Sequence, residues 1–252
     1  MTDDFRELKP LSCPWLISES QRLQLDDALQ PFRHVNPHFA LPSRPSISRY
    51  ISGYADGFTD HHPFIHMSTL SIVSYHRSPE TILALLSIGA QYRYETKTAR
   101  ALYQASRSII LERLRKGELY PLIQHETTSD TVFSDNMDRT RALLLLATYC
   151  SWQNQASLTQ ECFEYQGLIA RSIRQPRLLE MLSKPGYGWS QWIRLETDRR
   201  TTFFGWCLLN LQNFAYDISP LLISRELNQL PLPCTCQEWV ARNESEWLAA
   251  RA

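Results

Sequence analysis

The chain has 252 residues, of which 43% are hydrophobic and 21% charged, so it can bury a sizeable core and is not disordered throughout. Its 26 Lys and Arg residues balance 26 Asp and Glu residues, and the formal charge of zero excludes a chain that coats phosphates or a membrane by bulk charge, although a local basic stripe stays open. Only 8 glycines occur and the motifs GxGxxG, GxxxxGKS/T and GxSxG are absent, which argues against nucleotide-binding folds and α/β-hydrolases.

Residues 1–41 are predicted to form an N-terminal arm or linker ahead of a helical domain over 42–252. The N-terminus is acidic and mixed, unlike a signal peptide, and the longest apolar run, Ala142–Ala147, is too short to span a membrane. We therefore expect a soluble intracellular protein with no membrane partner. Gln21–Leu29 is a candidate short helix, and prolines break the sequence around it: Pro10, Pro14, Pro31, Pro37, Pro42 and Pro45.

Local signals predict two helices in the next part of the chain. Ser78–Glu80 supplies an N-cap, a first-turn proline and an acid at the positive end of the helix dipole, so a buried helix is expected to run to about Tyr92. Lys97–Lys116 has apolar residues at helical spacing and is predicted as the following helix, which Gly117 ends.

Residues 118–138 carry five acids and no Lys or Arg, and we expect a solvated connection there. Arg139–Trp152 is apolar on nearly all sides, as in a central buried helix. Ser157 is expected to cap another helix that runs to about Arg174. Because the joint between these two helices is short, they should pack as an antiparallel hairpin.

A turn is predicted over 184–188, followed by a long helix over Trp189–Phe214 and a further helix that starts near Gln237. No segment alternates convincingly as a β-strand does. The predicted fold class is therefore all-α, an irregular multi-helix bundle built from antiparallel helix hairpins.

The long helix combines a largely apolar face with charges. On a helical wheel, Glu196 and Arg200 lie in the middle of this face and Arg199 flanks it. An unpaired charge would cost on the order of several kcal/mol to bury, so Glu196 is predicted to pair with Arg200, four residues further on. The other members of the face are Trp189, Trp192, Ile193, Phe203, Cys207, Asn210 and Phe214.

Two roles are open for Glu196. It is either half of a structural ion pair that fixes the long helix to its neighbours, or an acid or base in a cleft. We favour the structural role, because an adjacent arginine keeps a carboxylate ionised and lowers its basicity. No catalytic residue is assigned, and an enzyme is the least favoured class.

The sequence offers only weak candidates for a metal site. His62 and His66 are four residues apart, with His61 beside them, but Pro63 intervenes and no acid follows at useful spacing. The cysteines of the range 234–236 form a lone CxC, for which packing or a surface location is favoured over zinc. The pair Asp26–Asp27 lacks the third acid of a prenyl-transfer metal site. No metal ligand is therefore assigned in this chain.

Three cysteines within apolar helical patterns, Cys150, Cys162 and Cys207, are expected to be reduced core residues. A set of basic residues falls on or near one face of the 97–116 helix. We expect a solvated face met by the acidic 118–138 segment, and favour this over a phosphate-binding stripe because no aromatic platform is interleaved. The set is Arg93, Lys97, Arg100, Arg107 and Arg115.

The long helix resembles the hallmark helix of the fungal-specific transcription factor domain, the middle homology region of fungal zinc-finger and zinc-cluster regulators. The matching pattern is Trp189-x-x-Trp192-x-x-x-Glu196-x-x-Arg199-Arg200-x-x-Phe203-Phe204. Other segments resemble the family in the same order over about 42–247: LPSR from Leu41, SRY from Ser48, HHPFIH from His61, LALLSIGAQY from Leu83, ALYQASR from Ala101, Leu144–Trp152, and Leu230-Pro231 with Trp239 and Trp247. Residues assigned to the family motif are His62, Pro63, His66, Trp192, Glu196, Arg199, Arg200, Pro231 and Trp239.

The resemblance implies a nuclear regulatory domain of a fungal RNA polymerase II transcription factor, without a cofactor of its own. DNA would be contacted only indirectly, through a zinc module that this chain lacks; the LPSR and SRY segments are most similar to members with two-Cys, two-His fingers. The family domain usually continues past the last tryptophan here. We therefore expect a fragment, a truncated gene model or a regulator without its own DNA reader.

The implied partners are the transcription machinery or a second copy of the chain, together with a small-molecule effector. The alternative is an all-α scaffold or small-molecule-sensing protein that does not bind DNA.

Overall fold

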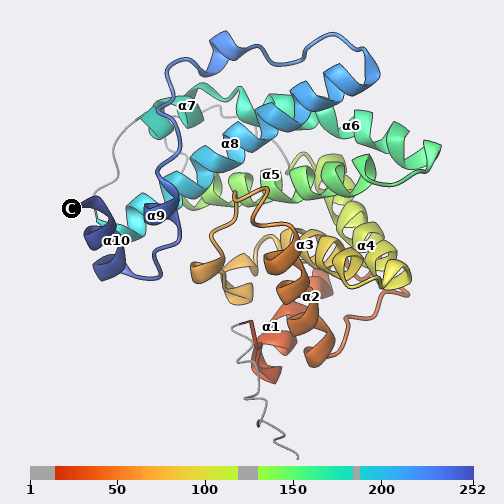
Figure 1. The fold of residues 1–252 in the computed structure, drawn as a ribbon. Helices are drawn as coiled ribbons and strands as arrows, with labels where there is room; N and C mark the ends of the chain where they lie inside the picture. The colour runs from red at the N-terminus through yellow and green to blue at the C-terminus, as the bar shows by residue number, and fades with distance from the viewer. Residues whose placement is uncertain (1–14, 119–129, 184–187) are drawn as a thin grey trace, which may run out of the picture.

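The computed structural model describes residues 15–118, 130–183 and 188–252, and these residues form α-helices and short 3₁₀ helices with no β-strand among them (Figure 1). The all-α prediction is confirmed. The α-helices are α1 (Glu19–Leu29), α2 (Arg44–Gly57), α3 (Pro79–Tyr92), α4 (Thr96–Arg115), α5 (Asp130–Ser151), α6 (Ala156–Ile173), α7 (Pro176–Ser183), α8 (Trp189–Tyr216), α9 (Cys236–Trp239) and α10 (Glu244–Arg251). The 3₁₀ helices are η1 (Gln30–Phe32), η2 (Met67–Thr69), η3 (Ile72–Tyr75) and η4 (Ser224–Leu227).

Helix α3 is buried on every side. All of its residues from Pro79 to Ala90 are buried, as expected for a helix that is apolar almost all round. Helices α2, α4 and α5 pack against it (Figure 1). The position of α3 therefore sets the positions of the three helices around it.

Helices α2 and α3 approach closely because Gly89 has no side chain. A Cβ atom at Gly89 would lie 1.9 Å from the backbone oxygen of Tyr50 in α2. Any larger residue would force the two backbones apart, since neither backbone can move without disturbing its own hydrogen bonds.

The second half of the chain is built on the α5–α6 hairpin. Residues 141–150 of α5 are all buried, and α6 packs along them after a short joint, as the sequence predicts. Helix α8 lies across this hairpin and also contacts α7 (Figure 1). No helix in the described part of the chain is long and apolar enough to cross a membrane.

The expected solvated connection over 118–138 is wrong for its last nine residues, because α5 begins at Asp130; residues 119–129 lie outside the described part. Two acids of this stretch find partners within the fold. Asp135 accepts a hydrogen bond from Arg77 at 3.3 Å, and Asp138 pairs with Arg141 at 2.5 Å. Met137 between them is buried in the core, so the stretch does not need to be solvated.

Most other predicted helix ends agree with the structure to within a few residues. Gly117 follows α4 with a φ of +72°, the left-handed backbone conformation that glycine adopts most easily. Ser157 is not the N-cap of α6, however, because the helix already begins at Ala156 and Gln155 is at the N-cap position. The predicted turn over 184–188 lies outside the described residues except for Gly188.

The long apolar face predicted for α8 is only half right. Its first part is buried, but Cys207 is exposed and Phe214 is 91% exposed. The C-terminal half of α8 instead buries Leu208, Leu209 and Gln212, because the neighbours of the helix change along its length. Of the three cysteines expected in the core, Cys150 and Cys162 are buried and Cys207 is not.

The segment 15–41 packs on the helical bundle. Leu25 and Leu29 of α1 and Phe32 of η1 belong to the same apolar core as α3. The capping box at Ser18, in which Gln21 returns a hydrogen bond, starts α1 slightly before the predicted helix. The division of domains at residue 41 stays a prediction.

Replacing Gly89 by alanine is expected to destabilise the protein by about 1–3 kcal/mol or more, because the new methyl group overlaps the backbone of α2. The matched control is Gly167→Ala in α6, where no atom lies within 4 Å of the added Cβ; it should be neutral or stabilising by about 0.5–1 kcal/mol. Urea denaturation of both variants measures the difference. Equal stabilities would contradict the close approach of α2 and α3.

Candidate functional site

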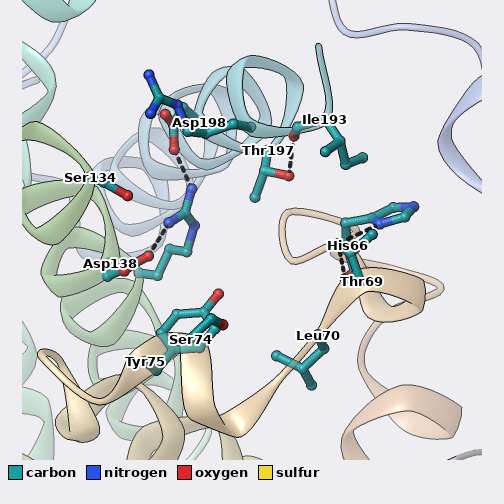
Figure 2. Close-up of a pocket in the computed structure, with 12 residues that line it drawn as sticks. His66, Thr69, Leu70, Ser74, Tyr75, Ser134, Asp138, Ile193, Thr197 and Asp198 are labelled. Carbon is teal, nitrogen blue, oxygen red and sulfur yellow. Dashed lines mark hydrogen bonds and ion pairs between the residues drawn. The ribbon is translucent and has the colours of Figure 1, made fainter. Parts of the chain in front are cut away.

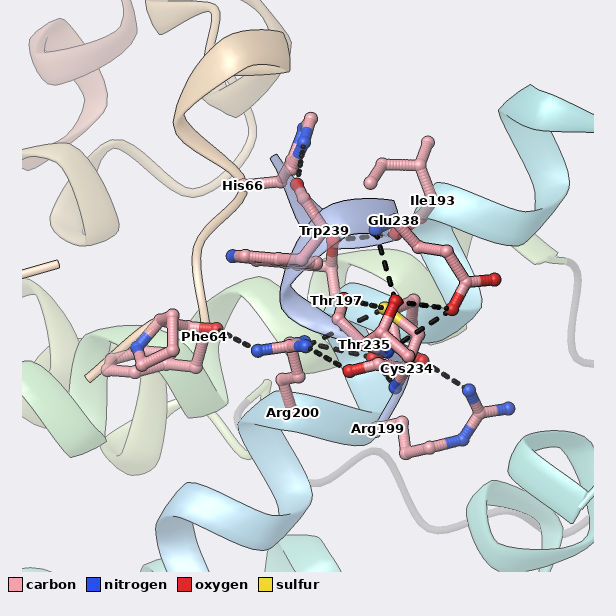
Figure 3. Close-up of polar contacts among 12 residues, drawn as sticks. Phe64, His66, Ile193, Thr197, Arg199, Arg200, Cys234, Thr235, Glu238 and Trp239 are labelled. Atoms are coloured by element: carbon pink, nitrogen blue, oxygen red, sulfur yellow. Dashed lines mark hydrogen bonds and ion pairs between the residues drawn. The ribbon is translucent and has the colours of Figure 1, made fainter. Parts of the chain in front are cut away.

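Glu196 lies in the middle of α8 with no exposed surface. Its Oε1 accepts hydrogen bonds from Arg200 Nε at 2.9 Å and from the backbone N–H of Cys234 at 2.8 Å, and its Oε2 accepts one from Arg199 Nη1 (Figure 3). The predicted pairing with Arg200 is confirmed. Arg199, which the wheel placed at the flank, is a second partner that the pattern did not identify.

The two arginines connect Glu196 to three other parts of the chain. Arg199 Nη2 donates to the backbone oxygen of Leu182 in α7 at 3.1 Å. Arg200 donates to the backbone oxygens of Cys234 at 2.9 Å and Pro63 at 3.4 Å (Figure 3). One buried carboxylate therefore organises contacts from α7, from the connector between α2 and α3 (residues 58–78), and from the C-terminal segment (residues 217–252).

His66 joins the connector directly to the C-terminal segment. Its Nε2 is 2.9 Å from the backbone oxygen of Trp239, which can only accept, so Nε2 carries the proton. Burial lowers the pKa of His66 and keeps the ring neutral, which makes Nδ1 the acceptor for the Thr69 hydroxyl at 2.9 Å. Both ring nitrogens are occupied, so His66 has no nitrogen free for a metal.

Aromatic rings complete the cluster. The Arg200 guanidinium lies 4.2 Å from the centre of the Trp239 ring, a distance that gives a favourable cation–π contact. Trp192 stacks on Trp189 at 5.6 Å and packs against Trp247 at 5.1 Å. We call the set that holds the two segments on α8 the clamp; its members are His66, Glu196, Arg199, Arg200, Cys234 and Trp239.

The remaining residues of the predicted family motif lie at different distances from the clamp. Pro63 contributes its backbone oxygen, and His62 packs between the rings of Phe58 and Phe204, at 4.8 and 5.0 Å. Pro231 is exposed and makes none of the clamp contacts described above. Its assignment to the motif stays a prediction.

The geometry of the clamp suits a structural tie. Glu196 is fully buried and accepts from three donors, so a substrate has no surface of the carboxylate to approach. Within residues 15–118, 130–183 and 188–252, no group of three or more His, Cys, Asp or Glu side chains is placed to hold a metal ion. That this chain has no metal and no cofactor of its own stays a prediction.

A polar cavity of about 230 Å³ lies beside the clamp, between the connector, α5 and α8 (Figure 2). Arg141 spans its wall, pairing with Asp138 at 2.5 Å and with Asp198, while its Nε donates to Thr201 at 3.1 Å. Burial raises the pKa of Asp138 to about 7. Arg141 acts in the opposite direction, but the nearby Asp198 carboxylate, which also pairs with Arg141, raises the pKa again.

Sequence reasoning missed this cluster and a similar one around Glu80. Glu80 was predicted only as a first-turn acid at the positive end of the helix dipole; it is fully buried and pairs with Arg113 Nε of α4 at 2.8 Å. The available signal was the position of Glu80 and Arg141 beside strongly apolar runs of their helices, where a charge needs a partner.

Arg113 of α4, which is not in the predicted basic set, meets the acidic 118–138 segment by pairing with Glu118 at 3.1 Å. Four members of the predicted set have partners elsewhere in the described part of the chain. Arg93 pairs with Asp56 at 2.6 Å and Arg107 with Glu161 at 2.9 Å. Arg115 pairs within its own helix, and Arg100 bonds to the side chain of Gln155. These contacts divide the basic face among several neighbours.

Comparison with known families gives a match for most of the chain. The family model described as "Fungal specific transcription factor domain" matches residues 32–251, a range that contains every residue of the clamp. This confirms the predicted resemblance. No curated protein and no solved structure matches the chain significantly.

Glu196→Ala is expected to destabilise the protein by about 3–5 kcal/mol, because it leaves two buried guanidiniums without their carboxylate. The control is Glu226→Ala, which removes the partly exposed pair with Arg174 and should cost about 0–1 kcal/mol. Glu196→Gln, which keeps the shape but not the charge, should fall between them. Wild-type stability of Glu196→Ala in urea denaturation would exclude a buried ion pair.

Asp138 is expected to make stability depend on pH. Its pKa of about 7 in the fold lies above the ordinary aspartate value near 3.9, so between these values the folded protein holds a proton that the unfolded chain releases. Its contribution is complete below about pH 4 and is lost as the pH rises through 7.

Asp138→Asn removes the titrating carboxyl group. As the pH rises from 4 to 7, the free energy of unfolding of the wild type should therefore fall relative to that of the variant, by up to about 1.4 kcal/mol per pH unit. Denaturation curves at several pH values measure the shift. A difference that stays constant between pH 4 and 7 would show that Asp138 does not take up this proton.

Proposed function

Because this chain belongs to the family of the fungal specific transcription factor domain, we propose that it is the regulatory part of a transcription factor, which controls RNA polymerase II transcription while a zinc module outside this chain reads the DNA. The observation that carries the proposal is the family match over residues 32–251. Membership of the family supports a role in the regulation of transcription. That a separate module binds the DNA is our proposal.

The clamp supports a role for the domain as one mechanical unit. It joins segments that resemble the beginning, middle and end of the family domain, through Pro63 and His66, Glu196, and Trp239. A fused module at either end would therefore be attached to a body in which the connector and the C-terminal segment are both tied to α8. Such a body can mask an activation segment or present it as a unit.

The charge distribution supports indirect contact with DNA. The formal charge is zero, and Arg93 and Arg107 of the basic face are engaged by Asp56 and Glu161. DNA binding through phosphates needs several cations free to replace counterions. We therefore assign DNA contact, and the zinc that it requires, to the module outside this chain, and we propose a nuclear location and no catalytic activity for the domain.

Tethering tests the proposal. The chain fused to the DNA-binding domain of a bacterial repressor should change transcription of a yeast reporter that carries the cognate operator several-fold, in either direction, relative to that DNA-binding domain alone. The chain without the fused domain should leave the reporter unchanged, because it has no DNA reader of its own. Reporter transcripts and occupancy of the operator are measured together.

Two outcomes would contradict the proposal. A folded fusion that occupies the operator without changing transcription would show that the chain is not a regulatory domain. Sequence-selective binding to duplex DNA by the chain alone, persisting as salt is raised, would show that the DNA reader is inside this chain.

A further inference from the structure

A second cavity, of about 360 Å³, lies where the C-terminal ends of α3 and α5 meet. Its volume falls at the lower end of the range of small-molecule pockets. We call it the aromatic pocket, because five of the side chains that line it are rings: Phe58, Tyr92, Tyr94, Tyr149 and Trp152.

The walls of the aromatic pocket are largely formed in advance. Phe58 and Tyr149 are buried, and Tyr149 is fixed by stacking on Tyr103 with ring centres 4.6 Å apart. The rim is open, with Trp152 70% exposed and Tyr94 93% exposed. Rings exposed to this degree beside a cavity can cover an occupant and lose contact with water when it binds.

Tyr94 is held at the rim by an uncommon backbone conformation. Its φ is +60°, the left-handed region that ends helices and that glycine or asparagine usually adopts. The turn is fixed by hydrogen bonds from the backbone N–H groups of Tyr94 and Glu95 to the last carbonyls of α3, at 3.0 and 2.9 Å. A large ring at this position is disfavoured for the turn itself, which points to a use for the side chain.

One polar atom of the lining is available to an occupant. Gln91 lines the pocket, and its Oε1 is buried without a hydrogen-bond partner among the described residues. A buried amide oxygen of this kind costs about 1–3 kcal/mol unless a donor reaches it. An occupant with one N–H or O–H group would supply that donor.

The uncharged lining selects against anions. Besides the hydroxyl groups of its tyrosines, the other polar side chains that line the pocket are Thr148 and Gln153, and no residue of the lining is charged. A carboxylate or phosphate would lose hydration there without gaining a counter-charge. We infer that the aromatic pocket binds a small, neutral, planar aromatic molecule that donates a hydrogen bond to Gln91 Oε1.

Contacts of Phe58 connect the aromatic pocket to the clamp. The Phe58 ring meets Phe204 of α8 edge-on at 6.4 Å and Phe64 of the connector at 6.2 Å, and Phe64 and Phe204 stack at 4.4 Å. An occupant that contacts Phe58 therefore acts on rings adjacent to Pro63 and Arg200. The inference that a ligand binds here depends only on the pocket. The further inference that this ligand is an effector rests on the proposed regulatory function.

Indole and benzothiophene test the inference with the purified chain. They are neutral bicycles of similar shape, and only indole has an N–H donor. Ligand-detected NMR titration should show saturable binding of indole, with benzothiophene weaker by about threefold to tenfold, the range expected for one hydrogen bond. Benzoate, which is planar but charged, should not bind measurably. The readout does not depend on transcription, so its failure is separate from failure of the proposed function.

Three variants locate the site. Trp152→Ala removes an exposed ring without opening the core and should weaken indole by about tenfold. Gln91→Leu should abolish the preference for indole over benzothiophene while both still bind. Phe214→Ala removes an even more exposed ring, on α8, that does not line the pocket, and this variant should bind indole as the wild type does.

Several results would overturn the inference. They are no saturable binding of indole by folded protein, equal affinities for indole and benzothiophene in the wild type, or the same loss of affinity in Phe214→Ala as in Trp152→Ala. Each of these would show that the rings and the amide do not act as a specific pocket.

Discussion

A carboxylate with no exposed surface dominates the arrangement of this domain. Removing Glu196 from water is favourable only because two guanidiniums and a backbone N–H surround it. That set leaves one positive charge in excess, which carbonyl oxygens and the face of Trp239 help to accommodate. Since those acceptors belong to α7, the connector and the C-terminal segment, satisfying one charge fixes three distant stretches of chain on α8.

The same device recurs at two other places in the bundle. Arg141 of α5 is held between Asp138 and Asp198, and thereby ties α5 to α8. Glu80 of α3 is held by Arg113 of α4, and thereby ties these two helices together. Buried pairs contribute little net stability compared with apolar side chains of the same size, but they allow only one relative position of two helices. The helices of this fold thus owe their cohesion to apolar burial and their register to charge.

The sequence was most informative where structure depends on neighbouring residues. The start of α3 lies at Pro79 as predicted, although the Ser78 hydroxyl makes no capping hydrogen bond, and the end of α4 follows from Gly117, because signals at helix ends act within one turn. It failed at residues 130–138, where the acids appear unmatched until Arg77 is brought to them by the fold. It also failed for Cys207 and Phe214, since a helical wheel treats one face as uniform while the neighbours of α8 change along its length.

Within the clamp, the wheel identified Glu196 and one of its two arginines, because their spacing along α8 is fixed by helix geometry. The carbonyl acceptors and the amide of Cys234 could not be predicted, as backbone groups carry no sequence signal. The aromatic pocket was likewise hidden. Its rings come from three separate helix ends, and nothing in their spacing indicates that they meet.

His66 and Trp239 are bonded across 173 positions of sequence, which has a consequence for biosynthesis. Helices α2 to α6 mostly contact their sequence neighbours and can assemble as they leave the ribosome. The carboxylate of α8 lacks its hydrogen bond from the Cys234 amide until residue 234 has been synthesised. Interruption of synthesis between α8 and Cys234 would therefore leave Glu196 with two of its three donors, and the connector without its bond from His66 to Trp239.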